Sequence, residues 1–356
     1  MDLAPVHPGI EARIVSEDGY DEWRRVLSDS AEGSPYQLPE YLAALTTAAG
    51  GRFNLVGVYN DGNTLIGGIG LYEPSGESKP VATSRYMLYY NEPFVLKSKS
   101  CVTSRLESDR RKVLLELLSY FSRLGYRTIR FKSRCPNADF RPMINAGWSV
   151  RPVYSYLAEI HDMDRLWKRM DRNARRQVQQ ARKSELIFTE YGSFSSFFDM
   201  HVGTHLHKGS PVYLPRRRYE RFVASLLDNN IARLFQVSSR NGEPLATQLV
   251  LFGAGQVAHT LCAGSNREVT GSGCNPYLRW RVFEWLAAEG YQALDLTDAQ
   301  NESVSRFKVQ LGADLRLGLE LTSPESALRR VMTASGRLSS RVAAKLSSVL
   351  VLRDVK

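Results

Sequence analysis

Two stretches of the chain repeat one pattern of helices, turns and apolar runs. Residues 114–157 and 279–322 align without a gap at a constant offset of 165 residues. The matched positions are Gly125 with Gly290, Tyr126 with Tyr291, and Gly147 with Gly312. Each stretch predicts a helix that stops at a glycine, a buried strand, a loop with an asparagine, a second helix and a last strand. An offset of this size is typical of a domain and too long for a solenoid repeat, so the pattern predicts two copies of one α/β unit.

Each half also predicts a β-hairpin ahead of the repeated stretch. Apolar residues flank Asp61-Gly62 in the first half and Asn241-Gly242 in the second, and both pairs are strong signals for a two-residue hairpin turn. A Ser-Pro-x-x-Leu-Pro run precedes a predicted helix in both halves, beginning at Ser34 and at Ser210. We therefore predict an α/β fold with mixed sheets, built from tandem domains. Their predicted bounds are 1–157 and 158–322, followed by a tail at 323–356.

The composition indicates a folded, globular protein. The 356 residues are 43% hydrophobic and 24% charged, which is enough apolar material for two cores. No stretch approaches the roughly 18 consecutive apolar residues of a membrane-spanning helix, and the N-terminus lacks a signal-peptide pattern, so a cytoplasmic protein is expected. Four widely spaced cysteines predict neither a zinc site nor a disulfide framework.

A net charge of +10 makes a polyanion or an anionic surface a plausible partner. Residues 165–183 carry eight Lys and Arg against the single acid Asp171. One interpretation is a solvated helix face; the other is that Arg172, Arg175 and Arg176 lie on one face and bind phosphate groups, which guanidinium groups match bidentately. The tail is also basic and amphipathic. It would either pack on the body or rest on an anionic membrane face.

Several catalytic classes have no visible residues in this sequence. There is no Walker-type phosphate loop, no G-x-S-x-G nucleophile motif and no cysteine paired with a histidine. His201, His205 and His207 lie close together but lack a supporting carboxylate, so no metal site is predicted. Transfer of an already activated acyl group to an amine needs no covalent intermediate, only positioning, proton removal and stabilisation of an oxyanion.

The run from Asp295 to Ala313 resembles the strand, loop and F-K-x-x-[FL]-G helix of Fem-type peptidyltransferases, which are tandem members of the GNAT N-acyltransferase superfamily. The segments SPYQLPEYLAAL, MDRNARRQVQQARK and NPYLRW agree with this resemblance. It implies two GNAT-like domains and direct attack of an amine on an ester or thioester. Fem-type relatives use aminoacyl-tRNA as donor and a peptidoglycan precursor as acceptor, whereas other relatives use acyl-CoA. The coiled-coil arm of staphylococcal Fem proteins is missing here, which weakens the tRNA assignment.

The resemblance also suggests catalytic residues. Lys308 matches the lysine of the F-K-x-x-[FL]-G motif and would neutralise a donor phosphate or the developing oxyanion; the alternative is a solvated lysine on an amphipathic helix. Asp295 and Asp298 follow an apolar strand, where a carboxylate can take a proton from an attacking amine. The alternative for either aspartate is a turn or cap residue.

Candidate donor and acceptor contacts are also predicted. Gly271, Gly273 and Asn275 lie between a strand and a helix, where GNAT enzymes hold the donor's pyrophosphate, although Glu268 stands where a basic residue is expected. Tyr213 and Tyr277 are candidate acceptor contacts, with aromatic core packing as the alternative. No bound cofactor is expected, because aminoacyl-tRNA or acyl-CoA would be a co-substrate.

Two hypotheses follow. The first is an N-acyltransferase that moves an aminoacyl or acyl group to an amine such as a peptidoglycan precursor or a peptide-like molecule, in the cytoplasm, with the tail as a peripheral contact to the inner membrane face. The second is a noncatalytic RNA- or anionic-membrane-binding protein on a degenerate GNAT scaffold. The absence of an RNP-like aromatic strand and of a GXXG clamp counts against an RNA-binding module.

Overall fold

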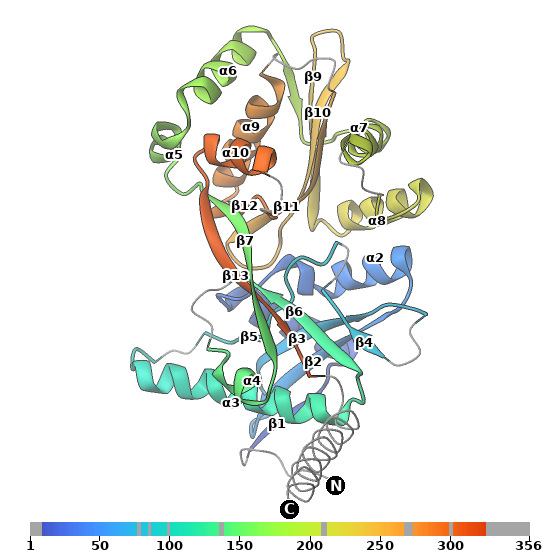
Figure 1. Cartoon of the computed structure of the whole chain (residues 1–356), viewed down its shortest axis with the longest axis vertical. Coiled ribbons are helices and arrows are strands. Elements are labelled where there is room, and N and C mark those ends of the chain that lie inside the picture. The colour runs from blue at the N-terminus through green and yellow to red at the C-terminus, as the bar shows by residue number, and fades with distance from the viewer. Residues whose placement is uncertain are drawn as a thin grey trace, which may run out of the picture.

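The computed structural model describes residues 9–76, 80–84, 87–97, 100–134, 139–207, 212–266, 273–298 and 302–324. The tail at 325–356 lies outside these residues, so its contact with a membrane stays a prediction. Two lobes are stacked along the long axis of the molecule, and two long strands run from one lobe into the other (Figure 1). Within the described ranges, no helix combines the length and the apolar character that crossing a membrane requires.

In the described residues, the first lobe runs from β1 to β7. Its elements are β1 (Ile10–Ile14), α1 (Tyr20–Asp29), α2 (Pro39–Ala49), β2 (Arg52–Asn60), β3 (Leu65–Glu73), β4 (Val81–Ala82), β5 (Phe94–Val95), α3 (Thr103–Arg123), β6 (Thr128–Ser133), α4 (Arg141–Asn145) and β7 (Ser149–Glu159), with short 3₁₀ turns at Glu17–Gly19 and Pro35–Gln37.

The second lobe begins with two further helices and then follows a similar order. Its elements are α5 (Met163–Arg169), α6 (Arg172–Lys183), β8 (Ile187–Thr189), α7 (Phe194–His207), α8 (Arg216–Asp228), β9 (Ala232–Ser238), β10 (Pro244–Leu251), β11 (Val257–Ser265), α9 (Cys274–Ala288), β12 (Ala293–Asp295), α10 (Glu302–Gln310) and β13 (Asp314–Thr322). The series α3, β6, α4, β7 thus returns as α9, β12, α10, β13, which confirms the repeat that the sequence predicts.

Both predicted hairpins are present, but each loop is one residue longer than predicted. In β2–β3 the Asn60 amide donates to Thr64 and the Asn63 amide to Asn60, with Asn63 at φ +54°. In β9–β10 the Ser239 amide donates to Glu243, and Gly242 has φ +84°. A type I turn closed by a left-handed residue is a common three-residue hairpin loop. The left-handed residue is therefore Asn63 in the first loop and Gly242 in the second. The prediction of two-residue loops was wrong.

The last strand of each unit joins the sheet of the other unit. A nine-stranded sheet has the order β4-β6-β13-β7-β12-β11-β10-β9-β8, and a separate sheet has the order β1-β2-β3-β5. Strand β7 pairs with β12, while β13 pairs with β7 along its length and with β6 at its end, where Leu319 faces Ser133. The predicted boundary at 157/158 falls within β7. Neither unit therefore completes its sheet without the other.

The described residues form three apolar cores. One lies between α3 and the first-lobe strands, and a second lies between the second-lobe strands and α5, α6, α9 and α10. The third core spans the seam, because α1 and α2 of the first lobe pack with α7 and α8 of the second. The rings of Tyr41 in α2 and Phe222 in α8 pack edge to face there, with their centroids 5.7 Å apart. In the second lobe, α6, α9 and α10 thus cover one face of the sheet and α7 and α8 the other (Figure 1).

Candidate functional site

Two neighbouring parallel strands separate in the middle of the second lobe. β11 and β12 pair only from Val257 opposite Ala293 to His259 opposite Asp295. Strand β11 then continues to Ser265, whereas the chain beyond Asp295 turns through Thr297 and Asp298. Ligands of open α/β sheets bind outside the carboxyl ends of strands, at points where the strands diverge. This opening is therefore the candidate active site.

Lys308 of α10 holds the turn that follows β12. Its side chain is 8% exposed, and its ammonium donates to the backbone carbonyls of Thr297 and Asp298. Both of those residues have positive φ, +51° and +26°, which is strained for a residue with a side chain. The ring of Tyr156 lies 5.9 Å from the ammonium. The structure thus excludes the interpretation of Lys308 as a solvated surface lysine and places a buried cation at the opening.

The two aspartates of the turn have different surroundings. Asp295 is 2% exposed and accepts hydrogen bonds from the Thr297 amide at 2.6 Å and from the Ser155 hydroxyl at 3.4 Å. Burial raises the pKa of Asp295, against the opposing effects of the Thr297 amide and the charges of Arg134 and Lys308. The Asp298 side chain is exposed. Asp295 therefore organises the turn, and Asp298 is the accessible carboxylate.

Aromatic groups from the first lobe reach the same strand ends. The fully buried ring of His259 lies 5.3 Å from the ring of Tyr36 and 5.6 Å from that of Tyr90. Tyr90 also hydrogen-bonds Asp295. Neither His259 nitrogen nor the Tyr36 hydroxyl has a partner within the described part of the chain, and burial lowers the pKa of His259 well below its usual value. His259 is therefore neutral at physiological pH.

The predicted donor loop ends against the basic helix. Gly273 precedes α9 at φ +74°, and a side chain there would lie 2.7 Å from the Gln177 carbonyl of α6. Asn275 donates to the Ser265 hydroxyl at 2.9 Å, which ties the start of α9 to the end of β11. Gly271 lies outside the described residues. The described end of the loop is thus a helix N-terminus, a type of site that favours anions.

The predicted phosphate-binding arginines lie on α6, beside α9 and α10. Arg172 and Arg176 are exposed, and Arg175 is half-buried. Asp171 caps α6, and its amide donates to the Gln310 carbonyl of α10 at 2.9 Å. The helix that carries the arginines, α6, therefore lies with α9 and α10 on one face of the second-lobe sheet (Figure 1).

Comparison with known proteins agrees with this geometry. Residues 159–308 match the model of the acetyltransferase (GNAT) domain. The solved structure of FemX has a TM-score of 0.65 at 14% identity, over 87% of this chain and 96% of that one. This chain has a Fem-like GNAT fold. A conserved protein of unknown function from Bacteroides thetaiotaomicron follows with a TM-score of 0.57 at 9% identity, over 88% of this chain and 100% of that one.

A third GNAT-fold neighbour is the C-terminal domain of a putative lysylphosphatidylglycerol synthetase from Agrobacterium fabrum. Its TM-score is 0.52 at 10% identity, over 86% of this chain and 92% of that one. No curated protein matches the sequence. The GNAT domain match and the shared fold support an acyltransferase, and the matched residues include the opening between β11 and β12.

The two predicted acceptor contacts lie in different parts of the GNAT fold. Tyr277 is 5% exposed in the second core, and its hydroxyl accepts from Arg281 at 3.3 Å, so its surroundings favour the core-packing interpretation. Tyr213 is 42% exposed, and its ring lies 5.5 Å from that of His205. Burial is the main cause that raises the pKa of Tyr213, and the neighbouring Cys262 and Asp298 act in the same direction. Across the described ranges, no cluster of three His, Cys, Asp or Glu side chains could hold a metal ion.

In the first lobe, the buried carboxyl group of Glu92 predicts an unusual pH dependence of stability. Ser133 Oγ and the Arg134 amide donate to it, yet burial raises its pKa from 4.5 to about 7. Glu92 therefore binds a proton more tightly in the folded state, and its contribution to stability is full below pH 4.5 and is lost as the pH rises through 7. Between pH 5 and 8 this change amounts to about 2 kcal/mol.

Replacing Glu92 with glutamine should remove that dependence. We expect Glu92→Gln to be more stable than the wild type at pH 8 and no more stable at pH 5. Urea unfolding at both pH values measures the difference, and Glu289→Gln on the surface is the control. An equal change in unfolding free energy at both pH values would contradict the assignment.

Proposed function

We propose that this protein is an N-acyltransferase that moves an activated aminoacyl or acyl group from a tRNA or coenzyme A carrier to an amine. The amine nitrogen attacks the carbonyl carbon, the carbon–oxygen bond of a tRNA ester or the carbon–sulfur bond of a thioester breaks, and a proton moves from nitrogen to the leaving group. The single observation that carries this proposal is the buried Lys308 ammonium, held against a strained turn where β11 and β12 separate inside the matched GNAT domain.

In this proposal the residues of the turn have separate roles. The positive charge of Lys308 stabilises the oxyanion that develops on the carbonyl, an effect that is strong where water is excluded. The exposed Asp298 carboxylate takes the proton of the amine and passes it to the leaving oxygen or sulfur. Asp295 positions the turn through the Thr297 amide and Ser155.

The donor is bound through its phosphate groups. Both tRNA and coenzyme A carry phosphates, and Arg172 and Arg176 are exposed on α6, the helix whose Gln177 carbonyl lies against Gly273 at the start of α9. The basic residues spread over residues 165–183 favour an extended polyanion as the ligand. Glu268 stands where a pyrophosphate loop would have a basic residue, which disfavours coenzyme A. We therefore propose aminoacyl-tRNA as the first donor to test and a peptidoglycan precursor or peptide-like amine as the acceptor.

Removing the two exposed arginines of α6 should weaken tRNA binding. We expect Arg172→Ala/Arg176→Ala to lower affinity about tenfold at low salt and to reduce the salt slope by between about 1 and 2, since each phosphate contact contributes roughly 0.7–0.9 to that slope. Filter binding of bulk charged tRNA at several salt concentrations measures both values, with acyl-CoA as competitor.

The matched control removes the same charge from the other face of the lobe. Arg217 and Arg218 of α8 are also exposed, so Arg217→Ala/Arg218→Ala should leave tRNA binding nearly unchanged. Equal weakening by both double variants would show that binding follows net charge alone. Binding of acyl-CoA without tRNA would reassign the donor to coenzyme A.

A further inference from the structure

Strand β6 carries positive charges at alternate positions. Arg130 and Lys132 are half-buried, Arg134 follows directly after the strand, and the residues between them are buried. Successive side chains of a strand point to opposite faces of a sheet, and the buried Ile129 and Phe131 pack with α3 in one of the three cores. The three cations therefore lie on the face of the sheet that turns away from α3.

Strand pairing extends this basic surface across three strands. Lys132 of β6 lies opposite Glu320 of β13, and Glu320 lies opposite Arg151 of β7 (Figure 1). Arg130 lies opposite Thr322, and its Nε donates to the Thr322 hydroxyl at 3.4 Å. Residues directly opposite each other have their side chains on the same face. Arg130, Lys132 and Arg151 thus form one surface, which we call the basic strip.

The basic strip has more positive than negative charge. Arg151 donates to Glu320 Oε1 at 3.0 Å, and the Lys132 ammonium lies 4.0 Å from Oε2 of the same carboxylate. Burial is the main cause that lowers the pKa of Lys132, against the charges of Glu320 and Asp298. The side chains of Arg151 and Lys132 are 69% and 25% exposed, so a ligand in solvent is able to reach them.

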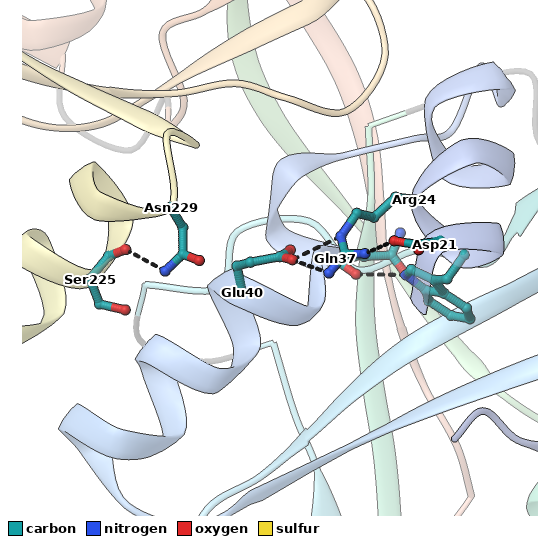
Figure 2. Close-up of polar contacts among 7 residues, drawn as sticks. Asp21, Arg24, Gln37, Glu40, Ser225 and Asn229 are labelled. Carbon is teal, nitrogen blue, oxygen red and sulfur yellow. Dashed lines mark hydrogen bonds and ion pairs between the residues drawn. The ribbon is translucent and has the colours of Figure 1, made fainter. Parts of the chain in front are cut away.

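A cation at the seam shows the opposite balance. Arg24 donates from Nε to Glu40 Oε1 at 2.8 Å and also binds Asp21 at 2.5 Å (Figure 2). Two carboxylates neutralise one guanidinium there, which leaves no positive charge for a ligand. The excess of cations in the basic strip is therefore not a general property of the first lobe.

The basic strip leads to the candidate active site. Arg151, Val153 and Ser155 lie on one face of β7, and the Ser155 hydroxyl donates to Asp295 at 3.4 Å. Four residues of strand separate Arg151 from Ser155, a distance of about 13 Å. Gly318 of β13 lies opposite Val153 between them and has no side chain. The surface between the strip and the opening is therefore low and free of charge.

The basic strip and the proposed donor site lie on opposite faces of the sheet. Ser155 lies on the face of the strip, whereas its neighbour Tyr156 packs in the second core, which the sheet forms with α5, α6, α9 and α10. The donor's phosphates are assigned to α6 and the start of α9, on the side of Tyr156. The strip is therefore placed to bind the other substrate.

We propose that the basic strip binds an anionic group of the acceptor, a phosphate or a carboxylate, about 13 Å from the amine that reacts. Guanidinium and ammonium groups both bind such oxyanions through charge-assisted hydrogen bonds. Because it rests on the proposed acyl transfer, this assignment defines the acceptor: an elongated amine with a negative charge at its far end.

Three peptide amides of one length test the charge of the ligand. They share the sequence Ala-Ala-Ala-Ser, with the serine unmodified, phosphorylated or replaced by glutamate, so the charge lies about 13 Å from the N-terminal amine. Isothermal titration of the full chain should give a Kd of about 1 mM or tighter for a charged peptide and about tenfold weaker binding of the unmodified one. The tighter of the two charged peptides identifies the anion as phosphate or carboxylate.

Two double variants locate the binding. Arg130→Ala/Lys132→Ala should weaken the charged peptides about tenfold and leave the unmodified peptide unchanged. Arg105→Ala/Arg111→Ala removes the same charge from exposed positions of α3, on the other face of the sheet, and should change nothing. Thermal unfolding of each variant checks that the fold is intact.

Binding is measured without a donor, so its result does not depend on whether acyl transfer occurs. Equal affinity for the three peptides would overturn the proposal, as would equal weakening by the strip variant and the α3 variant, or no binding by the wild type at millimolar concentrations. Loss of binding in Arg172→Ala/Arg176→Ala, with the strip variant unaffected, would also overturn it by placing the anion on the donor face.

Discussion

Replacing Lys308 with alanine should lower the acyl-transfer rate by about 100-fold or more, the usual effect of removing one group that stabilises an oxyanion. The substitution has two effects, and both lower the rate. The variant loses the cation at the opening between β11 and β12, and it also releases the positive-φ turn at Thr297 and Asp298. Donor affinity should change by only a few-fold, because the proposed function assigns the donor's phosphates to α6 and the start of α9 and not to Lys308.

Two further variants separate charge from packing. Lys308→Met keeps an apolar stem against Tyr156 and should be as slow as the alanine variant, whereas Lys308→Arg should recover part of the rate. Steady-state kinetics with kcat and KM determined separately is the measurement. Wild-type kcat in Lys308→Met would show that Lys308 only packs and would contradict its catalytic role.

The second large effect concerns stability. Gly318 lies in β13 where that strand passes into the first lobe, and the Ser133 carbonyl of β6 stands where a side chain would begin. Gly318→Val should therefore lower the free energy of unfolding by about 3 kcal/mol, since a rigid backbone oxygen must move and the β6–β13 pairing is disturbed.

Gly203 provides the matched control for this variant. It lies within α7, and a side chain added there meets nothing within 4 Å. Gly203→Ala should stabilise the protein by about 0.5–1 kcal/mol through helix propensity. Urea unfolding followed by fluorescence compares the two variants. A change below about 1 kcal/mol in Gly318→Val would mean that the strand exchange contributes little to stability.

Local sequence signals predicted most of the elements. The repeat, both hairpins and the basic helix α6 follow from periodicity, turn residues and charge, which act over a few neighbouring positions. The strand exchange was not predictable, because β7 and β13 carry the alternation of any half-buried strand and nothing local specifies which sheet receives them. Each hairpin loop was predicted one residue too short, because the left-handed residue is Asn63, after the Asp-Gly pair, in the first loop, and Gly242, as the third loop residue, in the second.

The candidate site was likewise predicted from the sequence only in part. Lys308 was identified from a motif and the two aspartates from their position after an apolar strand, but only the fold distinguishes the buried Asp295 from the exposed Asp298. His259 and Tyr36 are far apart in sequence and look like ordinary core residues, so their meeting depends on packing across the seam. The single signal for His259 was a polar residue inside an otherwise apolar strand.

Amine-dependent consumption of a carrier-bound acyl group tests the central claim most directly. Purified protein would be incubated with aminoacyl-tRNA or with acyl-CoA, with and without a panel of peptide-like amines, and loss of the ester or thioester would be followed over time. We predict that one of the two donors is consumed only when an amine is present, and that Lys308→Ala abolishes this consumption. Consumption of neither donor with any amine, by a folded wild-type protein, would contradict the assignment as an acyltransferase.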